Sequence, residues 1–449
     1  MRKLKLINFS GDLFATVLTF AGQTAIRLGS SIVLTRILVP ADYGKITIII
    51  SVAYVIALLA DTNVALYIVR EPHGDQPRYL NTAWTIRLVR SAFNTGAMFV
   101  LAPFVATSIY HVPSLTAPLR VFGLSFLIGG FQSMSLQLAI RRKQVRLITY
   151  WDLAIAFVST TFSVTYCYFS RTYWGMIYGI LLNGALTALV SQFIYPHERP
   201  HWQFDRSAAR SLLGLSKYTM PSSLLTLALN QYDKIVLLRL FDLKLLGIYG
   251  LAGNIVGSIE SLISKISQMV LYPRLAHGFR DERNGVARVF YRDNLRLVVT
   301  ILVLPALIGA AAPLLVQIIY PAKYTETGII IRILMLRAAL LALAAPAEDL
   351  LIATGQYQVI LHGNIVRAIA LVAGTLLGYR TLGFFGFVLG AAFSGLPPLV
   401  YYWYLQARAG LMIRTYELYK LGFMLAVAAM SYFASALLAP ILLLARHHI

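Results

Sequence analysis

Thirteen stretches of about 20 or more mostly apolar residues follow one another along the chain, and this pattern constrains the fold more than any other feature. A helix needs about 20 apolar residues to cross a bilayer. Only 13% of the residues are charged, against roughly a quarter in soluble proteins. The sequence therefore predicts an all-α polytopic membrane protein. The expected helices cover residues 10–38, 44–69, 82–108, 118–140, 148–169, 174–195, 216–241, 245–272, 295–319, 327–353, 358–379, 383–407 and 419–445.

Lysine and arginine gather at one side of these expected helices, which predicts their orientation. If the N-terminus lies in the cytoplasm, 25 of the 39 Lys and Arg residues fall at inner ends, nine at outer ends and five inside helices. Cytoplasmic loops of membrane proteins carry an excess of these residues. The pattern predicts a cytoplasmic N-terminus, a cytoplasmic segment 196–215 and short outer turns. Arg87 and Arg90 are counted among the inner charges.

The remaining composition excludes several classes of function. The formal charge of +21 suggests an anionic partner, but no soluble domain is long enough to carry a nucleic-acid surface. Lipid headgroups and anionic lipid-linked substrates fit better. No P-loop, G-x-S-x-G or H-E-x-x-H motif occurs, which excludes ATP-driven motors, hydrolases of that type and zincins. The lone Cys167 and the scattered histidines predict no disulfide, no metal site and no cofactor.

The stretch from Ile32 to Gly44 recurs about 200 residues later, from Ile235 to Gly250. Each copy has an apolar run, an arginine and a polar turn that ends in Tyr-Gly, and the second turn is longer by three residues. Upstream of each copy, five polar residues lie along one face of a helix. We interpret the chain as a duplication. The corresponding residues are Thr16, Thr19, Gln23, Arg27 and Ser30 in the first copy and Thr219, Ser222, Thr226, Asn230 and Asp233 in the second.

A third polar face lies in the expected helix 245–272, and charged residues accompany all three faces. A charge at mid-bilayer costs at least about 2.5–3.5 kcal/mol, so those that persist usually line water or a pathway. Three such faces turned toward one another would enclose a hydrated, basic cavity. Alternatively, the acidic groups neutralise the basic ones in a structural set of salt bridges. The third face comprises Asn254, Ser258, Ser261, Lys265 and Gln268, and the intramembrane charges are Arg27, Asp61, Asp233, Lys234, Glu260, Lys265, Arg332 and Arg337.

The repeated stretch and the residues around it resemble the polysaccharide transporter family of the multidrug/oligosaccharidyl-lipid/polysaccharide exporter superfamily. The resemblance covers about residues 5–410, and lipid II flippases and teichuronic acid exporters are similar. Members are flippases that move undecaprenyl-diphosphate-linked repeat units of O-antigen or capsule across the bacterial inner membrane. The motifs that carry the resemblance are Gly22 to Gly44 with its turn Arg36-Ile-Leu-Val-Pro-Ala-Asp-Tyr-Gly44, Asn230-Gln-Tyr-Asp-Lys234, Leu246-Gly-Ile-Tyr-Gly250 and Tyr272-Pro273-Arg274.

The resemblance implies a MATE-like fold of two six-helix bundles related by a pseudo-two-fold axis along the membrane normal. The chain departs from this pattern by one extra C-terminal helix, because relatives mostly have twelve or fourteen spans. The expected parts are an N-terminal six-helix bundle at 1–195, a cytoplasmic linker at 196–215, a C-terminal six-helix bundle at 216–407 and an additional membrane helix within 408–449.

The resemblance also implies a cationic cavity for the diphosphate-sugar headgroup, and coupling to a proton or sodium gradient. Membrane lipids, a polysaccharide polymerase and a chain-length regulator are the other expected partners. The expected substrate-binding residues are Arg27, Lys234, Lys265, Gln23, Asn230, Asn254 and Arg337, and the expected ion-coupling residues are Asp61, Asp233 and Glu260.

Two other functions stay open at this point. A cation-coupled multidrug exporter would share the fold but would favour acidic cavity walls, whereas five basic and three acidic groups lie inside the expected helices. A membrane-embedded polysaccharide polymerase or ligase would be an enzyme with a long external loop, whereas the expected outer turns are about ten residues at most.

Overall fold

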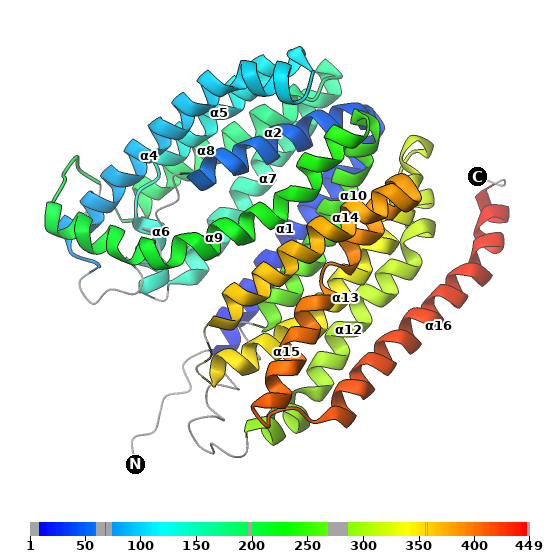
Figure 1. The fold of residues 1–449 in the computed structure, drawn as a ribbon. Helices are drawn as coiled ribbons and strands as arrows, with labels where there is room; N and C mark the ends of the chain where they lie inside the picture. Colours follow the sequence, from blue (N-terminus) through cyan, green and yellow to red (C-terminus); the bar gives the residue numbers. More distant parts are fainter. Residues whose placement is uncertain are drawn as a thin grey trace. The chain divides into compact units, whose positions relative to one another are not determined.

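The computed structural model describes residues 9–59, 68, 74–142, 144–195, 200–267, 286–354, 356 and 358–446, and every regular element within them is a helix (Figure 1). Packing divides the chain into two compact units, Met1–Leu246 and Gly247–Ile449. By length and apolar content, eight helices of the described residues can each cross a membrane, and a bent pair of shorter helices brings the number to nine. The all-helical, multi-span class expected from the sequence is confirmed.

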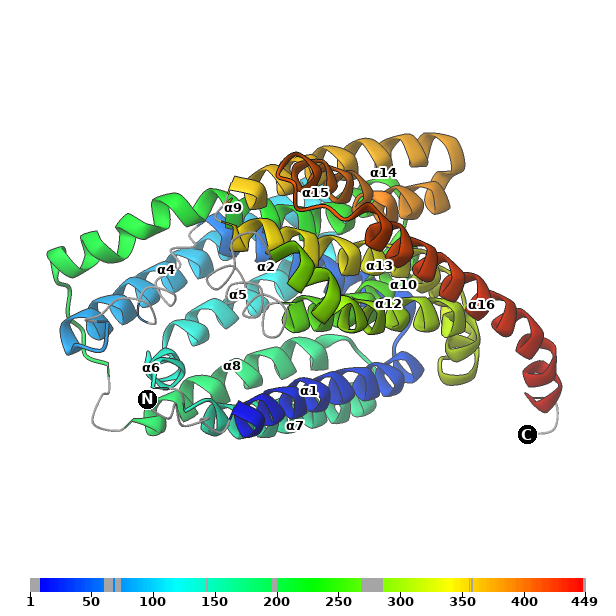
Figure 2. The same ribbon diagram turned by 90° about the horizontal axis from the view of Figure 1, so that it is seen from below.

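The helices of the first unit pack side by side. In it α4 lies against α5, α5 against α8, α7 against α8, and α2 against α9. Figure 2 shows α1 beside α7, as their packing requires. The helices are α1 (Phe9–Ile37), α2 (Pro40–Leu59), α4 (Pro77–Phe104), α5 (Thr116–Gly130), α6 (Ser135–Arg141), α7 (Val145–Ser170), α8 (Trp174–Ile194), α9 (Arg206–Leu240) and the first turn of α10 (Leu243–Ile266).

The helix expected at 118–140 is broken, because α5 and α6 meet at a bend of 53°. Ser133 and Ser135 both donate hydroxyl hydrogen bonds of 2.6 Å to the carbonyl of Ser191 in α8. The backbone N–H of Ser133 donates to the Ser191 hydroxyl at 2.9 Å. A break inside a membrane frees backbone polar groups that need new partners, and this serine cluster supplies some of them.

The chain entering α9 lies along the first turns of α4. Asn81 of α4 accepts from the His201 N–H at 3.1 Å and donates to the Gln203 side chain at 3.0 Å. Thr85 donates to the Gln203 carbonyl at 3.0 Å, one turn further along. Asp205 then caps α9 by accepting from the backbone N–H of Ala208. This segment is therefore fixed to the first unit.

The helices of the second unit pack around α13, which lies against α12, α14 and α15, while α16 lies against α12. Within α14 two helical segments turn back at Gly383, whose φ of 59° suits glycine. The turn brings Gly378 against Gly386, and Gly374 against Gly390. Small residues at these positions permit the two helix backbones to approach closely. The helices are the rest of α10 from Gly247, α12 (Val286–Ile319), α13 (Glu326–Ala353), α14 (Gln358–Phe393), α15 (Leu396–Arg408) and α16 (Arg414–Arg446).

A helix, α16, lies where the sequence predicts the additional C-terminal membrane helix, and its crossing of the membrane stays a prediction. Near its start, Lys420 and Glu417 form a fully buried ion pair of 2.5 Å. The indole N–H of Trp403 in α15 donates to the second oxygen of Glu417 at 3.0 Å. Hydrogen bonding to a third group offsets part of the desolvation that a buried ion pair requires. The pair links the start of α16 to α15.

The two copies of the repeated stretch have the same local structure. Each forms the end of one helix, a short turn and the start of the next, in α1–α2 and in α9–α10. Leu34 and Leu237 are buried at corresponding positions, as are Tyr43 and Tyr249. The two turns are equally long, so the expected longer second turn is wrong: the three extra residues lie inside α10, between its start and Tyr249. The repeat therefore encodes one helix–turn–helix unit that the chain uses twice.

Candidate functional site

The polar residues expected to bind substrate lie mostly at accessible positions of their own units. On α1, Gln23 is half-buried and Arg27 is exposed. Asn230 on α9 is exposed, and so are Asn254 and Lys265 on α10. An exposed polar side chain in a membrane-spanning segment faces either lipid or water, and lipid disfavours it. Their role in substrate binding stays a prediction.

Lys234 and Asp233 lie on α9, where it packs against α2. The Lys234 ammonium donates to the Gln231 side-chain oxygen at 3.4 Å, and that oxygen also accepts from Ser51 of α2 at 3.0 Å. Asp233 is buried and accepts from the backbone N–H of Lys234 at 2.9 Å. The two neighbouring charges therefore have different environments. Asp61, the third acidic candidate with Asp233 and Glu260, lies outside the described residues.

Arg337 and Glu260 are brought together within the second unit. The guanidinium Nε of Arg337 lies 2.7 Å from Oε1 of Glu260, and its Nη2 donates to Oε2 at 3.3 Å. This two-bond geometry is the strongest form of an ion pair between side chains. For these two residues the structural salt bridge considered above is present. A substrate anion at Arg337 would have to compete with the Glu260 carboxylate.

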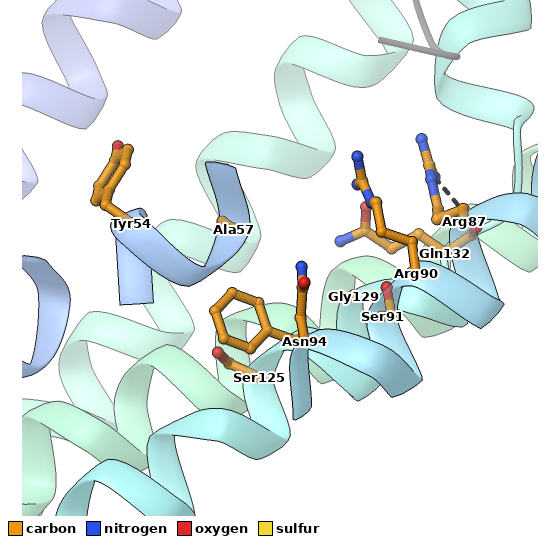
Figure 3. Close-up of a pocket in the computed structure, with 10 residues that line it drawn as sticks. Tyr54, Ala57, Arg87, Arg90, Ser91, Asn94, Ser125, Gly129 and Gln132 are labelled. Atoms are coloured by element: carbon orange, nitrogen blue, oxygen red, sulfur yellow. Dashed lines mark hydrogen bonds between the residues drawn. The ribbon is translucent and has the colours of Figure 1, made fainter. Parts of the chain in front are cut away.

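A cavity of about 380 Å³ lies within the first unit, bounded by α2, α4 and α5 (Figure 3). Small-molecule sites in proteins have volumes of roughly 300–1,000 Å³, so the cavity is large enough for part of a ligand. Polar and charged residues of α4 face apolar and small residues of α2 and α5. The lining residues are Tyr54, Ala57, Arg87, Arg90, Ser91, Asn94, Ser125, Phe126, Gly129 and Gln132.

One face of α4 supplies the charged part of the lining. Arg87, Arg90, Ser91 and Asn94 follow the spacing i, i+3, i+4 and i+7, which places all four on the same side of a helix. Figure 3 shows Arg87, Arg90 and Asn94 projecting to that common side. Arg87 lies ten residues, or about 15 Å, beyond the start of α4 at Pro77. The two arginines are therefore well inside the apolar helix.

Arg87 connects α4 to the break between α5 and α6. Its Nη1 donates to the backbone carbonyls of Gln132 at 3.2 Å and Ser133 at 3.5 Å. These carbonyls follow the end of α5, where the interrupted helix leaves acceptors without intrahelical donors. A guanidinium has five N–H donors in a planar fork, and both of these bonds use the same nitrogen. Arg87 can thus support the break and still present donors to the cavity.

Asn94 is the most buried polar group of the lining, with 3% of its surface exposed. Its side-chain oxygen finds no hydrogen-bond donor among the described residues. A buried acceptor of this kind is uncommon, since the great majority of buried side-chain polar atoms have a partner. The oxygen is enclosed by protein atoms, so an entering O–H or N–H group would satisfy it once the Asn94 side chain turns toward the cavity.

The electrostatics of the cavity favour an anion. Arg87 and Arg90 are close enough for their positive charges to repel each other. None of the ten described lining residues is acidic. Two half-buried guanidinium groups in a cavity whose described lining holds no carboxylate gain most from a ligand that carries negative charge.

Interpretation of the sequence missed this site because Arg87 and Arg90 were assigned to the inner ends of the helices, as orientation signals. Their spacing with Ser91 and Asn94 is the same kind of helix-face signal that marked Gln23 and Arg27. The site could have been found by testing every expected helix for a polar face. Within the described residues, no group of three or more His, Cys, Asp or Glu side chains could hold a metal ion.

Three characterised bacterial proteins have similar sequences. The amylovoran biosynthesis protein AmsL of Erwinia amylovora is 23% identical over 280 residues, covering 62% of this chain and 72% of that protein. The succinoglycan biosynthesis transport protein ExoT of Rhizobium meliloti is 20% identical over 366 residues, covering 81% and 73%. The lipopolysaccharide biosynthesis protein WzxC of Escherichia coli is 22% identical over 364 residues, covering 80% and 72%.

Solved structures of membrane transporters have the same fold. An inward-facing multidrug resistance MATE transporter aligns with a TM-score of 0.67 at 14% identity, covering 87% of this chain and 94% of that one. The lipid II flippase MurJ in an inward closed conformation aligns with a TM-score of 0.66 at 10% identity, covering 96% and 99%. The MATE/MurJ-like fold expected from the sequence is confirmed. Residues 33–329 match the model of the polysaccharide biosynthesis protein family, which is more than half of the chain, so the chain belongs to that family.

Proposed function

We propose that the protein is a flippase that moves an undecaprenyl-diphosphate-linked oligosaccharide across the membrane for surface polysaccharide assembly. The names of the relatives place them in the biosynthesis or transport of such polymers, and the fold is shared with a lipid II flippase. The observation that carries the proposal to this chain is the cavity in the first unit, with two arginines and no acidic residue among its described lining.

The physical problem of the reaction is the transfer of a diphosphate through hydrocarbon. A bare ion in a medium of low dielectric constant carries a very large solvation penalty, of order 20 kcal/mol in the idealised case. Guanidinium and ammonium groups along a hydrated route reduce that penalty, while the polyprenyl tail stays in lipid. A multidrug exporter with cationic substrates would need the opposite charge sign in such a cavity.

The proposed function also includes a driving force for transport, a location in the cell and partner proteins. The sequence has no P-loop, so transport would be driven by a proton or sodium gradient or by consumption of the product. Asp233 and Glu260 are the described candidates for ion coupling. The proposed location is the bacterial inner membrane with a cytoplasmic N-terminus. A polysaccharide polymerase and a chain-length regulator are the proposed partners, because they would use the flipped unit.

The test is a strain without the gene, scored for the leaflet in which the lipid-linked repeat unit accumulates. The intact protein should restore outer-leaflet exposure, and its failure to do so would reject the flippase function. Arg27→Ala, Lys234→Ala and Lys265→Ala should reduce exposure at equal expression. Arg36→Ala is the matched control, since Arg36 is an exposed arginine at the end of α1 outside the polar face. If all three variants restore exposure as well as the control, these residues do not bind substrate.

A further inference from the structure

The cavity of the first unit has a more specific chemistry than positive charge alone. It combines two guanidinium groups with one buried acceptor, and all three belong to one face of α4 (Figure 3). Asn94 lies one helical turn beyond Arg90, so its acceptor is about 6 Å further along the helix axis. A ligand that fits this arrangement carries negative charge at one end and an O–H or N–H donor next to it.

We infer that this cavity binds the diphosphate and the first sugar of the lipid-linked oligosaccharide, with Arg87 and Arg90 on the phosphate oxygens and Asn94 accepting from the sugar. The inference rests on the proposed flippase function and names the group recognised. Arginine suits phosphate because its planar fork donates two parallel hydrogen bonds. A hydroxyl or acetamido N–H of the sugar joined to the diphosphate supplies the donor for Asn94.

A purely structural role explains only part of the arrangement. Arg87 supports the carbonyls at the break between α5 and α6, and that alone would justify one arginine. Arg90 lies one turn away on the same face and brings a second positive charge to the cavity, beside that of Arg87. The role of Arg87 at the break does not explain a buried amide oxygen without a donor among the described residues. Arg90 and Asn94 therefore give the sharper test.

Two kinds of lipid in a bacterial membrane carry a phosphate group that the two arginines could bind. One is the diphosphate of the lipid-linked sugar, and the other is the headgroup of an anionic phospholipid such as phosphatidylglycerol. Both would contact the arginines. Both also carry a hydroxyl donor near the phosphate, since the headgroup of phosphatidylglycerol is glycerol. Only the lipid-linked sugar has two phosphates for the two arginines, so a preference for diphosphate lipids over phosphatidylglycerol distinguishes the two sources.

The experiment measures binding of four defined lipids to the purified full-length protein by native mass spectrometry. The lipids are undecaprenyl diphosphate with one N-acetylated sugar, undecaprenyl diphosphate, undecaprenyl monophosphate and phosphatidylglycerol. The variants are Arg90→Gln, Arg90→Lys, Arg87→Gln and Asn94→Leu. Arg78→Gln is the matched control, because Arg78 is an exposed arginine on α4 outside the cavity. Thermal unfolding verifies that each variant is folded. If Arg90→Gln does not fold, Arg90→Lys replaces it in the test, because lysine keeps the positive charge but not the planar fork.

Arg90→Gln and Arg87→Gln should weaken binding of both diphosphate lipids about 10–100-fold, as expected for a charged hydrogen bond, and Arg90→Lys should weaken it less. Asn94→Leu should weaken the sugar-bearing diphosphate lipid by about 10-fold and leave undecaprenyl diphosphate without the sugar unchanged. Unchanged diphosphate binding in Arg90→Gln or Arg90→Lys at normal folding rejects the inference. Equal losses for phosphatidylglycerol reject it too and identify a general phospholipid site. If the intact protein restores outer-leaflet exposure while these variants bind normally, the proposed function stands and only this site is wrong.

Discussion

Arg337 and Glu260 face each other across α13 and α10 with two hydrogen bonds, one of 2.7 Å from Nε and one of 3.3 Å from Nη2. Their side chains are 15% and 19% exposed, so water screens the pair only partly. The two residues were assigned opposite roles from the sequence, one in binding an anionic substrate and the other in coupling to an ion. Because they are paired, a change in one residue also alters the surroundings of the other, so each variant needs a stability measurement beside a transport measurement.

Glu260→Gln should therefore lower the thermal unfolding temperature, because it leaves the Arg337 guanidinium without its carboxylate. Removal of one partner from a well-buried pair costs about 3–5 kcal/mol, and the partial exposure here makes that an upper bound. The double variant Glu260→Leu/Arg337→Met should recover most of the loss, since replacing both partners removes the unpaired charge. If Glu260→Gln unfolds at the normal temperature but changes the dependence of transport on the ion gradient, the pair is a coupling element.

Gly386→Ala should destabilise the second unit, because the Cβ of alanine would be placed against the Gly378 carbonyl. Overpacking of this kind costs about 1–3 kcal/mol, and two backbones cannot shift as easily as a side chain. Gly253→Ala is the control, since no described atom lies within 4 Å of a Cβ at Gly253. In a helix interior that change should be neutral or stabilising by up to about 1 kcal/mol. Equal unfolding temperatures for both variants in detergent would contradict the close packing of α14.

Much of the fold could be predicted from sequence because a membrane allows few alternatives. The helix expected at 174–195 is observed at Trp174–Ile194, since an apolar run bounded by polar residues has little choice of ends. The break at 131–134 was missed. It depends on hydroxyl contacts to Ser191, which lies 58 residues further along the chain, and no local pattern contains that contact.

The candidate site was predictable in part. The spacing of Arg87, Arg90, Ser91 and Asn94 shows that they share a face of α4, so the polar face could be predicted. Its partner surfaces could not, because Tyr54 and Gln132 come from distant parts of the chain and meet α4 only in the folded unit. The lack of a donor for the Asn94 oxygen among the described residues also depends on tertiary packing.

The first turn of α9 should be insensitive to pH near neutrality and should lose stability in acid. Hydrogen bonds from the Ser207 hydroxyl and then from the Ala208 N–H lower the pKa of Asp205 below its usual 3.8. A lowered pKa in the folded state means that the carboxylate stabilises the fold above the unfolded pKa. That contribution is lost as the pH falls through the folded value, so it is constant from about pH 5 to 8.

Hydrogen exchange of amides 206–209, corrected for intrinsic rates, measures the stability of this first turn. Protection in the intact protein should decline below about pH 4, and in Asp205→Asn it should be independent of acid because Asn also caps helices but does not titrate. Asp205→Ala should reduce protection at every pH. Acid-dependent protection that persists in Asp205→Asn would assign the effect to another group.

The orientation of α4 decides whether Arg87 and Arg90 lie toward the cytoplasmic or the outer side of the membrane, and labelling of single cysteines can measure it. Cys167 is fully buried, so Cys167→Ala provides a cysteine-free background with little change to the surface. In that background Ser114→Cys lies in the exposed turn before α5, and Trp202→Cys lies in the exposed segment before α9. The distribution of Lys and Arg predicts that a membrane-impermeant maleimide labels residue 114 in spheroplasts and labels residue 202 only after permeabilisation. That result would place the start of α4 in the cytoplasm, where the lipid-linked unit is expected to enter the cavity. The opposite labelling would invert the orientation and make the same cavity a release site.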